Sequence, residues 1–293
     1  MSKTNLKPLI LDGREVANEV LKVVKTDISY LKSKNKRLPG LAVILVGDNK
    51  ASHTYVTNKE KKCIELEIHS EVYKFPANIP EIEVIKKIKE LNNSVTLDGI
   101  LLQLPLPKHM KSENLLESIL PIKDVDGLHP LNMGKLIAGQ ECLKPCTPQG
   151  VIEILKYYAI PLEGRQVVMV GRSVLVGKPL SILLLGENAT VTIVHSKSKN
   201  INEITKSADI VISAIGKPNL IKSNWIKHDS VIIDIGINKI TEDGKEKIVG
   251  DVDFKDVSSI CKAITPVPGG VGPMTIAMLI LNTLKAYKMR NEW

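Results

Sequence analysis

The sequence has few aromatic residues: Phe, Trp and Tyr together account for 3% of 293 residues. Proteins that bind single-stranded nucleic acids stack the bases on aromatic side chains, and few such side chains are available here. The net charge of +8 comes from lysines scattered over several predicted helices, not from one basic block. We therefore expect small anionic ligands and no nucleic-acid partner.

Long apolar runs and targeting signals are also absent. No run reaches the roughly 18 apolar residues that span a bilayer, so we expect no membrane partner. Residues 1–16 lack the apolar core and cleavage site of a secretory signal, and Asp12 and Glu15 argue against a transit peptide. The expected location is cytoplasmic.

Cysteine is scarce, and its spacing does not match a metal motif. None of the four cysteines forms a Cys-x-x-Cys pair, and Cys142 and Cys146 have no further ligands near them in sequence. Asp124 and Asp126 lack the additional oxygens of a calcium loop. We expect reduced, partly buried thiols and no metal site.

Short β-branched runs alternate with segments of helical periodicity, which is typical of parallel βαβ units. The predicted fold class is α/β, with two domains. The first is an N-terminal α/β catalytic domain and the second a Rossmann-like nucleotide-binding domain with a parallel sheet, and we expect a cleft between them. The Pro- and Gly-rich segment 129–150 predicts the crossing between domains. We expect domains at 1–147 and 148–269, with a C-terminal helix in 270–293 returning to the first.

The pattern predicts the individual elements as well. Expected strands lie at 41–47, 71–75, 99–106, 166–171, 190–195, 210–216 and 230–237. Expected helices lie at 14–34, 53–67, 81–93, 148–158, 178–186 and 275–290, the last with one apolar face.

The turn GRSVLVGKP, residues 171–179, stands between a predicted strand and a predicted helix. In Rossmann domains such a turn holds the pyrophosphate of a dinucleotide with helix N-terminal amides. The G-x-G-x-x-G fingerprint is incomplete, because Ser173 and Val176 occupy glycine positions and Gly177 comes one residue late. A plain βα turn with a surface arginine is the alternative.

Several side chains favour a dinucleotide with a 2′-phosphate. Gly171 permits the tight turn, the Ser173 hydroxyl can donate to a phosphate, and the Arg172 guanidinium matches phosphate geometry. NAD-specific sites carry an acid at the end of the next strand, whereas this strand ends in HSKSK, with His195 and Ser196 and no acid. The pattern predicts NADP. Glycines at the ends of two later strands, in SAIGKP and DIGIN, support a ligand at this sheet edge.

The helix predicted at 53–67 follows a strand directly, so its first turns lie at the carboxyl-end rim of the first sheet. Ser52 is the expected N-cap. Tyr55 and Lys59 then share a helix face, with Lys62 a turn farther on. A lysine exchanges protons near neutral pH only if desolvation or nearby positive charge lowers its pKa. A solvated lysine and a packed tyrosine are the alternatives.

Two further polar residues are candidates in the first domain. Gln103 ends the apolar strand in GILLQLPLP and can donate to a substrate carbonyl or orient Lys59; a satisfied strand-end glutamine is equally compatible. Asp126 in KDVDG can accept paired hydrogen bonds from a ring amide and amino group, or form a surface Asx turn.

The loop PVPGGVGPMT, residues 266–275, precedes the last predicted helix. Its glycines let the backbone pass close to a ligand, and Thr275 is the expected helix cap. An interdomain linker is the alternative.

Taken together, the motifs resemble one known family, the bifunctional methylenetetrahydrofolate dehydrogenase/methenyltetrahydrofolate cyclohydrolases. The resemblance covers nearly the whole chain. It rests on SHTYVTNKEKK, LLQLPLP, KDVDGLHP, PCTPQG, GRSVLVGKP, DIGIN, GDVD and PGGVGPMT.

The resemblance implies oxidation of 5,10-methylenetetrahydrofolate with NADP, followed by hydrolysis to 10-formyltetrahydrofolate, in a homodimer joined through the nucleotide domain. Such an enzyme supplies one-carbon units for purine, histidine and methionine biosynthesis. The implied catalytic and folate-binding roles are acid/base for Lys59, support of its amine for Gln103, stacking for Tyr55 and pterin anchoring for Asp126. Implied pocket residues are Pro268, Gly269, Gly270 and Val271. Implied NADP contacts are Gly171, Arg172, Ser173, His195, Ser196 and Ile237.

Three other functions remain open at this point. A monofunctional NADP-dependent dehydrogenase would not need both Lys59 and Gln103. A shikimate-dehydrogenase-like enzyme does not account for QLPLP and PGGVGPMT. A non-catalytic NADP-binding regulator does not account for the polar residues at several strand ends. One departure from the family pattern is Glu67 before Ile68, where a glycine helix stop is expected.

Overall fold

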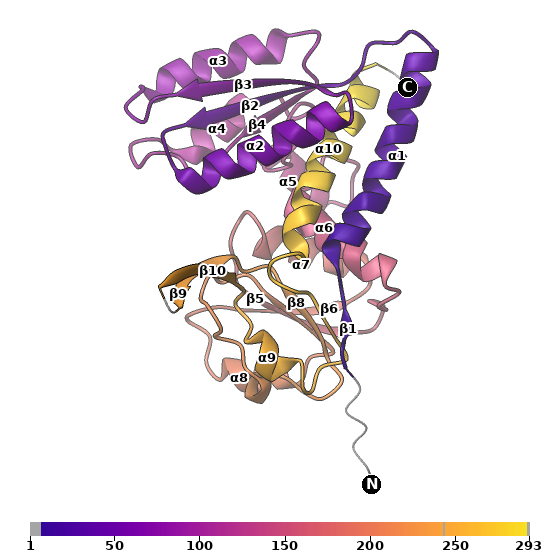
Figure 1. Cartoon of the computed structure of the whole chain (residues 1–293), viewed down its shortest axis with the longest axis vertical. Coiled ribbons are helices and arrows are strands. Elements are labelled where there is room, and N and C mark those ends of the chain that lie inside the picture. Colours follow the sequence, from indigo (N-terminus) through magenta and orange to yellow (C-terminus); the bar gives the residue numbers. More distant parts are fainter. Residues whose placement is uncertain (1–6, 243, 292–293) are drawn as a thin grey trace. The chain divides into compact units, whose positions relative to one another are not determined.

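A computed structural model describes residues 7–242 and 244–291 (Figure 1). The chain divides into two compact units, which are named here by their sheets. The three-stranded unit comprises Asn18–Cys146 and Ile276–Trp293. The six-stranded unit comprises Met1–Ala17 and Thr147–Thr275.

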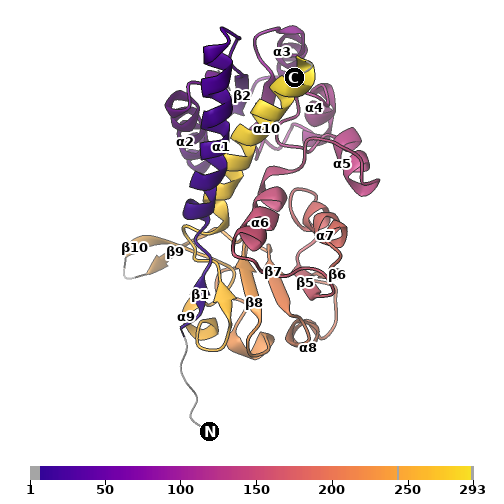
Figure 2. The ribbon, with the colours of Figure 1, turned by 90° about the vertical axis from the view of Figure 1, so that its right-hand side faces the viewer.

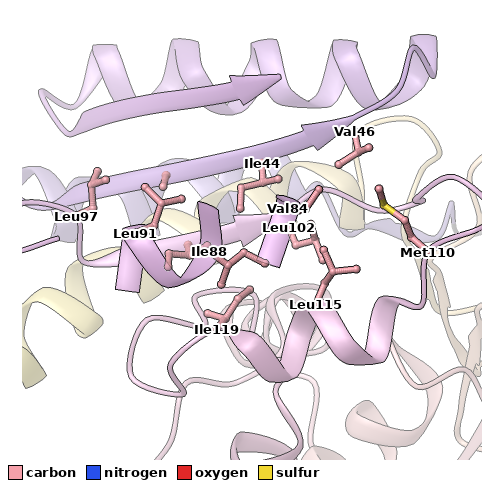
Figure 3. Packing of buried hydrophobic residues seen from close by; sticks show 12 residues of the cluster. Ile44, Val46, Val84, Ile88, Leu91, Leu97, Leu102, Met110, Leu115 and Ile119 are labelled. Carbon is pink, nitrogen blue, oxygen red and sulfur yellow. The ribbon is translucent and has the colours of Figure 1, made fainter. Parts of the chain in front are cut away.

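The three-stranded unit is built on a parallel sheet with the order β3-β2-β4. Its strands are β2 (Gly40–Val46), β3 (His69–Phe75) and β4 (Gly99–Leu102). Both β2 and β4 are buried along their whole length, which explains their continuous apolar sequences. Alternate residues such as Ile44 and Leu102 pack on one face against α3 (Glu81–Asn93) and α4 (Ser112–Ser118) (Figure 3).

Further helices complete this unit. They are α2 (Lys50–Glu65), which contacts β2 and β3, α5 (Pro130–Ile137), and most of α1 (Gly13–Ser33) and α10 (Val271–Arg290). Lys288 of α10 donates to Asp27 of α1 at 2.9 Å. The fully buried Asp98 pairs with both Arg37 and Arg290 at 2.7 and 2.6 Å. The end of α10 is therefore fixed to the start of β4.

The six-stranded unit has a parallel sheet with the order β1-β11-β8-β7-β5-β6 (Figure 2). The chain runs from β5 to β6 on one side and then to β7 on the other. This reversal makes the carboxyl end of β5 the topological switch point, where open α/β sheets bind ligands. The strands are β1 (Leu9–Ile10), β5 (Gln166–Val170), β6 (Thr190–Val194), β7 (Ile210–Ser213), β8 (Val231–Asp234) and β11 (Ala263–Ile264).

The remaining elements of this unit are short. They are α6 (Cys146–Tyr157), α7 (Gly177–Gly186), α8 (Ile201–Lys206), the 3₁₀ turn η1 (Ser223–Trp225), α9 (Phe254–Val257), and a hairpin of β9 (Asn238–Glu242) and β10 (Lys245–Val249). The expected α/β class with a parallel nucleotide-binding sheet is confirmed. The residues preceding α1 group with 147–275, because Leu9 pairs with Ala263 across β1 and β11.

Two expected helix caps are wrong. The helix α2 begins at Lys50, where Asn49 is the N-cap and its side chain accepts from the Ser52 backbone N–H at 3.1 Å. Thr275 lies inside α10, and its hydroxyl is hydrogen-bonded to that of Thr147 at 2.8 Å. In both cases the helix starts about one turn earlier than the sequence suggested.

The described residues include no helix that is long and apolar enough to cross a membrane. They also contain no group of three or more His, Cys, Asp and Glu side chains arranged to hold a metal ion. All four cysteines are buried and free of disulfide bonds.

Glu67 occupies the position where a glycine helix stop is expected, and it adopts the left-handed conformation itself, with φ of 58°. The Ile68 N–H donates to the Cys63 carbonyl at 2.9 Å, and the Glu67 N–H to that of Ile64 at 3.1 Å. The helix end is therefore closed as a glycine would close it, at a cost in backbone strain.

Glu67→Gly should raise the free energy of unfolding by about 0.5–1 kcal/mol, because relief of the left-handed strain exceeds the extra entropy of an unfolded glycine. The exposed ion pair with Lys32 contributes little. Urea unfolding followed by circular dichroism measures the change. Glu67→Ala, which keeps the strain, is the control; equal stability of the two variants would contradict the prediction.

Candidate active site

Lys59 lies on the buried face of α2, in the series Ser52, Val56, Lys59 and Cys63. Its side chain is 6% exposed. Burial penalises the charged ammonium and so lowers the pKa of Lys59 below its usual value. The alternative of a solvated surface lysine is thereby excluded.

Gln103 holds the Lys59 amine. The Lys59 Nζ donates to the Gln103 Oε1 at 3.0 Å. Gln103 directly follows β4, where its backbone N–H donates to Ile44 at 2.9 Å and its side-chain Nε2 donates to the Leu104 carbonyl at 2.7 Å. Because the amide nitrogen is occupied by a carbonyl, the oxygen faces the amine. An amine that donates to Gln103 keeps its lone pair for another proton.

Asp126 is the charged neighbour of this amine. The carboxylate of Asp126 acts to raise the pKa of Lys59, although burial outweighs it. Burial also raises the pKa of Asp126, and the positive charge of Lys59 opposes that rise. Asp126 is half-buried, which leaves part of its surface for a ligand. The two groups therefore lie close enough for each to influence the protonation of the other.

The other aspartate of the KDVDG motif has a structural role. Asp124 is buried and accepts hydrogen bonds from the His129 backbone N–H at 2.8 Å and from the Asn132 side chain at 2.9 Å. These bonds join the motif to the start of α5. Of the two aspartates, only Asp126 is left as a candidate for ligand binding.

Cys146 is a neighbour that sequence reasoning missed. Its thiol donates to the Val125 carbonyl at 3.2 Å, and it interacts with both Asp126 and Lys59. Burial raises the pKa of the Cys146 thiol well above its usual value. The thiol therefore stays protonated and is no nucleophile. The only signal for it in the sequence was its place in the PCTPQG motif.

Tyr55 lies one turn before Lys59 on the same side of α2 and is half-buried. Burial raises the pKa of Tyr55, so its ring is a neutral surface suited to stacking. Lys62, expected on the same face, instead pairs with Glu65 at 2.5 Å and is partly exposed.

The loop expected to line the folate pocket belongs to the six-stranded unit. Gly269 has φ of 111°, and its carbonyl accepts from the Gly13 N–H at 3.0 Å. A Cβ on Gly270 would come within 2.6 Å of the Pro266 carbonyl oxygen. Pro268 precedes these glycines and Val271 begins α10. The compact loop thus requires glycine twice; its role toward folate stays a prediction.

The glycines of GRSVLVGKP allow backbone segments to pack closely at the carboxyl end of β5. Gly171 has φ of 125°, and a Cβ there would lie 2.5 Å from the Ala214 carbonyl oxygen, just after β7. A Cβ on Gly177 would lie 2.4 Å from the Gly171 carbonyl oxygen. The late glycine therefore lets α7 start against the turn, which is the task of the third glycine in the usual fingerprint.

Polar groups in the same turn fit a phosphate. The Ser173 hydroxyl accepts from the backbone N–H groups of Val176 and Gly177 at 3.2 and 3.3 Å, and it retains its own hydrogen to donate. Ser173 and Arg172 are both exposed. The Ser173 side chain, at a position where the usual fingerprint has glycine, thus stabilises the turn by these two hydrogen bonds.

The turn after β6 lies beside the turn after β5, since the Gly171 N–H donates to the Val194 carbonyl at 2.8 Å. The ring Nδ1 of His195 accepts from the Lys197 backbone N–H at 3.2 Å, so the ring stabilises the turn. Ser196 and Lys197 are exposed, and residues 195–199 carry no acid. This composition fits a 2′-phosphate. Ile237, 50% exposed, lies between β8 and β9.

Comparison with known proteins decides the family. The model described as "Tetrahydrofolate dehydrogenase/cyclohydrolase, catalytic domain" matches residues 11–126, and the one described as "Tetrahydrofolate dehydrogenase/cyclohydrolase, NAD(P)-binding domain" matches residues 145–291. The chain belongs to the tetrahydrofolate dehydrogenase/cyclohydrolase family. The resemblance inferred from the motifs is thereby confirmed.

Individual members of the family are similar over almost their whole length. "Bifunctional protein FolD" of Thermodesulfovibrio yellowstonii is 52% identical over 283 residues, which cover 97% of this chain and 98% of that protein. The crystal structure of the Campylobacter jejuni FolD enzyme has a TM-score of 0.92 at 48% identity, covering 96% of this chain and 99% of that one. The Trypanosoma brucei FolD, described as complexed with NADP cofactor and inhibitor, has a TM-score of 0.94 at 35% identity, covering 98% and 100%.

Asp126→Asn should lower the pKa of Lys59 further, because it removes the negative charge that acts to raise that pKa. The ¹³Cε chemical shift of Lys59, titrated by NMR without substrate and assigned with Lys59→Met, measures it. Glu65→Gln, which removes an exposed carboxylate paired with Lys62, is the control and should leave the titration unchanged. A Lys59 pKa that stays the same or rises in Asp126→Asn would show that these groups do not interact.

Gly177→Ala should lower the free energy of unfolding by roughly 1–3 kcal/mol, because the new Cβ collides with backbone that has no room to move. Gly186→Ala is the matched control, since it lies at the other end of α7 with no atom within 4 Å of its Cβ position. Urea unfolding compares the two. Equal stabilities would mean that Gly177 is not needed for close packing.

Proposed function

We propose that this protein oxidises 5,10-methylenetetrahydrofolate with NADP⁺ and then hydrolyses the 5,10-methenyl product to 10-formyltetrahydrofolate. The observation that carries the proposal is the buried Lys59 amine held by Gln103 with Asp126 beside it. The family to which the chain belongs supplies the two activities.

The hydrolytic step needs a group that moves protons. Water adds to the methenyl carbon between two nitrogens and loses one proton, which leaves a neutral carbinol. The carbon–nitrogen bond to one nitrogen then breaks as that nitrogen gains a proton, and the hydroxyl releases its own proton to solvent as the formyl C=O forms. A neutral Lys59 amine takes the first proton and, as an ammonium, returns it to the leaving nitrogen. A lowered pKa suits both the uptake of the proton from water and its return to the leaving nitrogen. Gln103 keeps the amine in place throughout.

Binding of the folate is assigned to groups around that amine and to the glycine-rich loop. Asp126 accepts two hydrogen bonds from the amide and amino edge of the pterin, for which its half-buried carboxyl group leaves part of its surface available. Tyr55 stacks on the aromatic system. Residues 268–271 supply backbone close to the ligand.

NADP is assigned to the carboxyl edge of the six-stranded sheet. When bound, it supplies the nicotinamide that accepts a hydride from the folate. Gly171 and Ser173 hold the pyrophosphate, and Arg172 and Ser196 hold the 2′-phosphate. His195 shapes the turn, and Ile237 would contact the bound cofactor. Exposed cations and the lack of an acid at 195–199 support NADP over NAD.

The wider setting follows from the family resemblance. The proposal includes a cytoplasmic homodimer joined through the six-stranded unit, and a role in supplying one-carbon units to purine, histidine and methionine biosynthesis. Analytical ultracentrifugation tests the dimer. The Lys59–Gln103 contact favours a bifunctional enzyme over a monofunctional dehydrogenase, and the family match favours it over a shikimate-dehydrogenase-like enzyme.

Lys59→Met should reduce hydrolysis of methenyltetrahydrofolate by roughly 10²–10⁴-fold, because the proton-transfer group is lost while the side-chain volume is kept. NADP-dependent oxidation of methylenetetrahydrofolate should remain measurable in the same preparation. Both rates are followed by absorbance.

Lys62→Met is the matched control, since Lys62 lies on the same helix but pairs with Glu65 at the surface. It should leave hydrolysis unchanged. Full hydrolysis by Lys59→Met would remove Lys59 from the mechanism. A wild-type protein that binds folate and NADP but turns over neither would instead establish a regulator.

A further inference from the structure

A fully buried carboxylate, Asp251, lies in the GDVD motif, to which the proposed function gives no role. It accepts hydrogen bonds from two separate loops. The donors are Ser213 Oγ at 3.1 Å, the backbone N–H groups of Ile215, Gly216 and Lys217 at 2.8, 3.3 and 2.9 Å, and Asn238 Nδ2 at 3.0 Å.

Asp234, at the end of β8, fixes Asp251 in turn. Its carboxylate accepts from the backbone N–H groups of Asp251 and Val252 at 3.0 and 2.8 Å, and from that of Gly236 at 2.9 Å. Glycines make room for both carboxylates. A Cβ on Gly250 would lie 1.8 Å from an oxygen of Asp234, and a Cβ on Gly236 would lie 2.3 Å from the Asp251 Cγ.

The loops that Asp251 joins follow the carboxyl ends of β7 and β8. The first, 213–217, begins beside the phosphate turn, because the Ala214 carbonyl is the group that excludes a Cβ from Gly171. The second ends at Ile237 and leads into Asn238, the first residue of β9. With the pyrophosphate at the end of β5 and the 2′-phosphate at the end of β6, the strand order leaves β7 and β8 for the other half of a dinucleotide.

We propose that Asp251 is a positioning residue for the dinucleotide: its carboxylate holds both loops in the shape that receives the nicotinamide half. The proposal rests on the NADP binding proposed above. Asp251 is buried and does not touch the cofactor itself. It acts by satisfying three consecutive backbone N–H groups and one amide side chain, so that no other loop conformation is equally well hydrogen-bonded.

Asp251→Asn tests the role with little change in shape. The amide nitrogen that replaces one oxygen faces donors, and at least two hydrogen bonds are lost. The dissociation constant for NADP⁺, measured by isothermal titration calorimetry, should rise roughly tenfold or more. Amide hydrogen exchange in residues 213–218 should become faster. Hydrolysis of methenyltetrahydrofolate without NADP should stay within about twofold of the wild type, since Lys59 and Gln103 lie in the other unit.

Asp209→Asn is the matched control. Asp209 immediately precedes β7, at the opposite edge of the same sheet, and accepts from the Gln166 N–H at 2.9 Å and from Lys227 at 2.6 Å. Its removal should leave NADP⁺ affinity unchanged. Failure of the wild type to bind NADP⁺ would refute the proposed function itself and not only the role of Asp251.

Two results would overturn the positioning role. One is unchanged NADP⁺ affinity in Asp251→Asn. The other is a loss of NADP⁺ binding and hydrolysis in the same proportion, matching an unfolded fraction seen by circular dichroism. Should Asp251→Asn not fold, Ser213→Ala decides the question. Ser213 is fully buried and donates to Asp251. Its loss should weaken NADP⁺ binding roughly threefold, and unchanged affinity would reject the proposal.

Discussion

Burial removes the water that stabilises a charged lysine amine. Unless another group stabilises that charge, the pKa of the amine falls. Lys59 has one neutral partner, the Gln103 oxygen, and one charged neighbour, Asp126. Burial lowers the pKa of Lys59 while Asp126 limits how far it falls. Two opposing effects therefore set the proton affinity of this amine. The Asn49 cap fixes the start of α2, and the packing of α2 on β2 and β3 covers this amine.

Much of this arrangement follows from local sequence. The bounds of α3 were predicted correctly, because its apolar residues repeat at helical spacing between a proline and a polar segment. The two-residue strands β1 and β11 were missed, since so short a strand has no period to detect. α5 is not predicted by the sequence, because the Pro- and Gly-rich composition of 129–150 indicates a loop, although proline is well tolerated in the first turn of a helix.

The burial of Lys59 was harder to predict than its helix. The face on which it lies also carries Ser52 and Cys63, so no apolar stripe marks that face as buried. The family resemblance pointed to Lys59 and Gln103, but their contact depends on how α2 packs on the sheet, which places Lys59 beside the residue that follows β4. The motif GDVD contributed to the resemblance, but the contacts of Asp251 could not be predicted from it, because its partners come from separate segments that only the sheet brings together.

The two units each contain a buried ionisable side chain, and these side chains differ in how many hydrogen-bond partners they have. Lys59 has one neutral hydrogen-bond partner, and burial lowers the pKa of its amine. Asp251 has donors for both oxygens, which join the backbone that follows β7 to the carboxylate. Gly236 and Gly250 belong to the Asp251 arrangement, because a Cβ at either position would collide with a carboxylate that is hydrogen-bonded to the main chain. The number of hydrogen-bond partners thus separates the two buried groups: one partner leaves the Lys59 amine a lone pair or a proton to exchange, whereas five donors hold the Asp251 carboxylate in place.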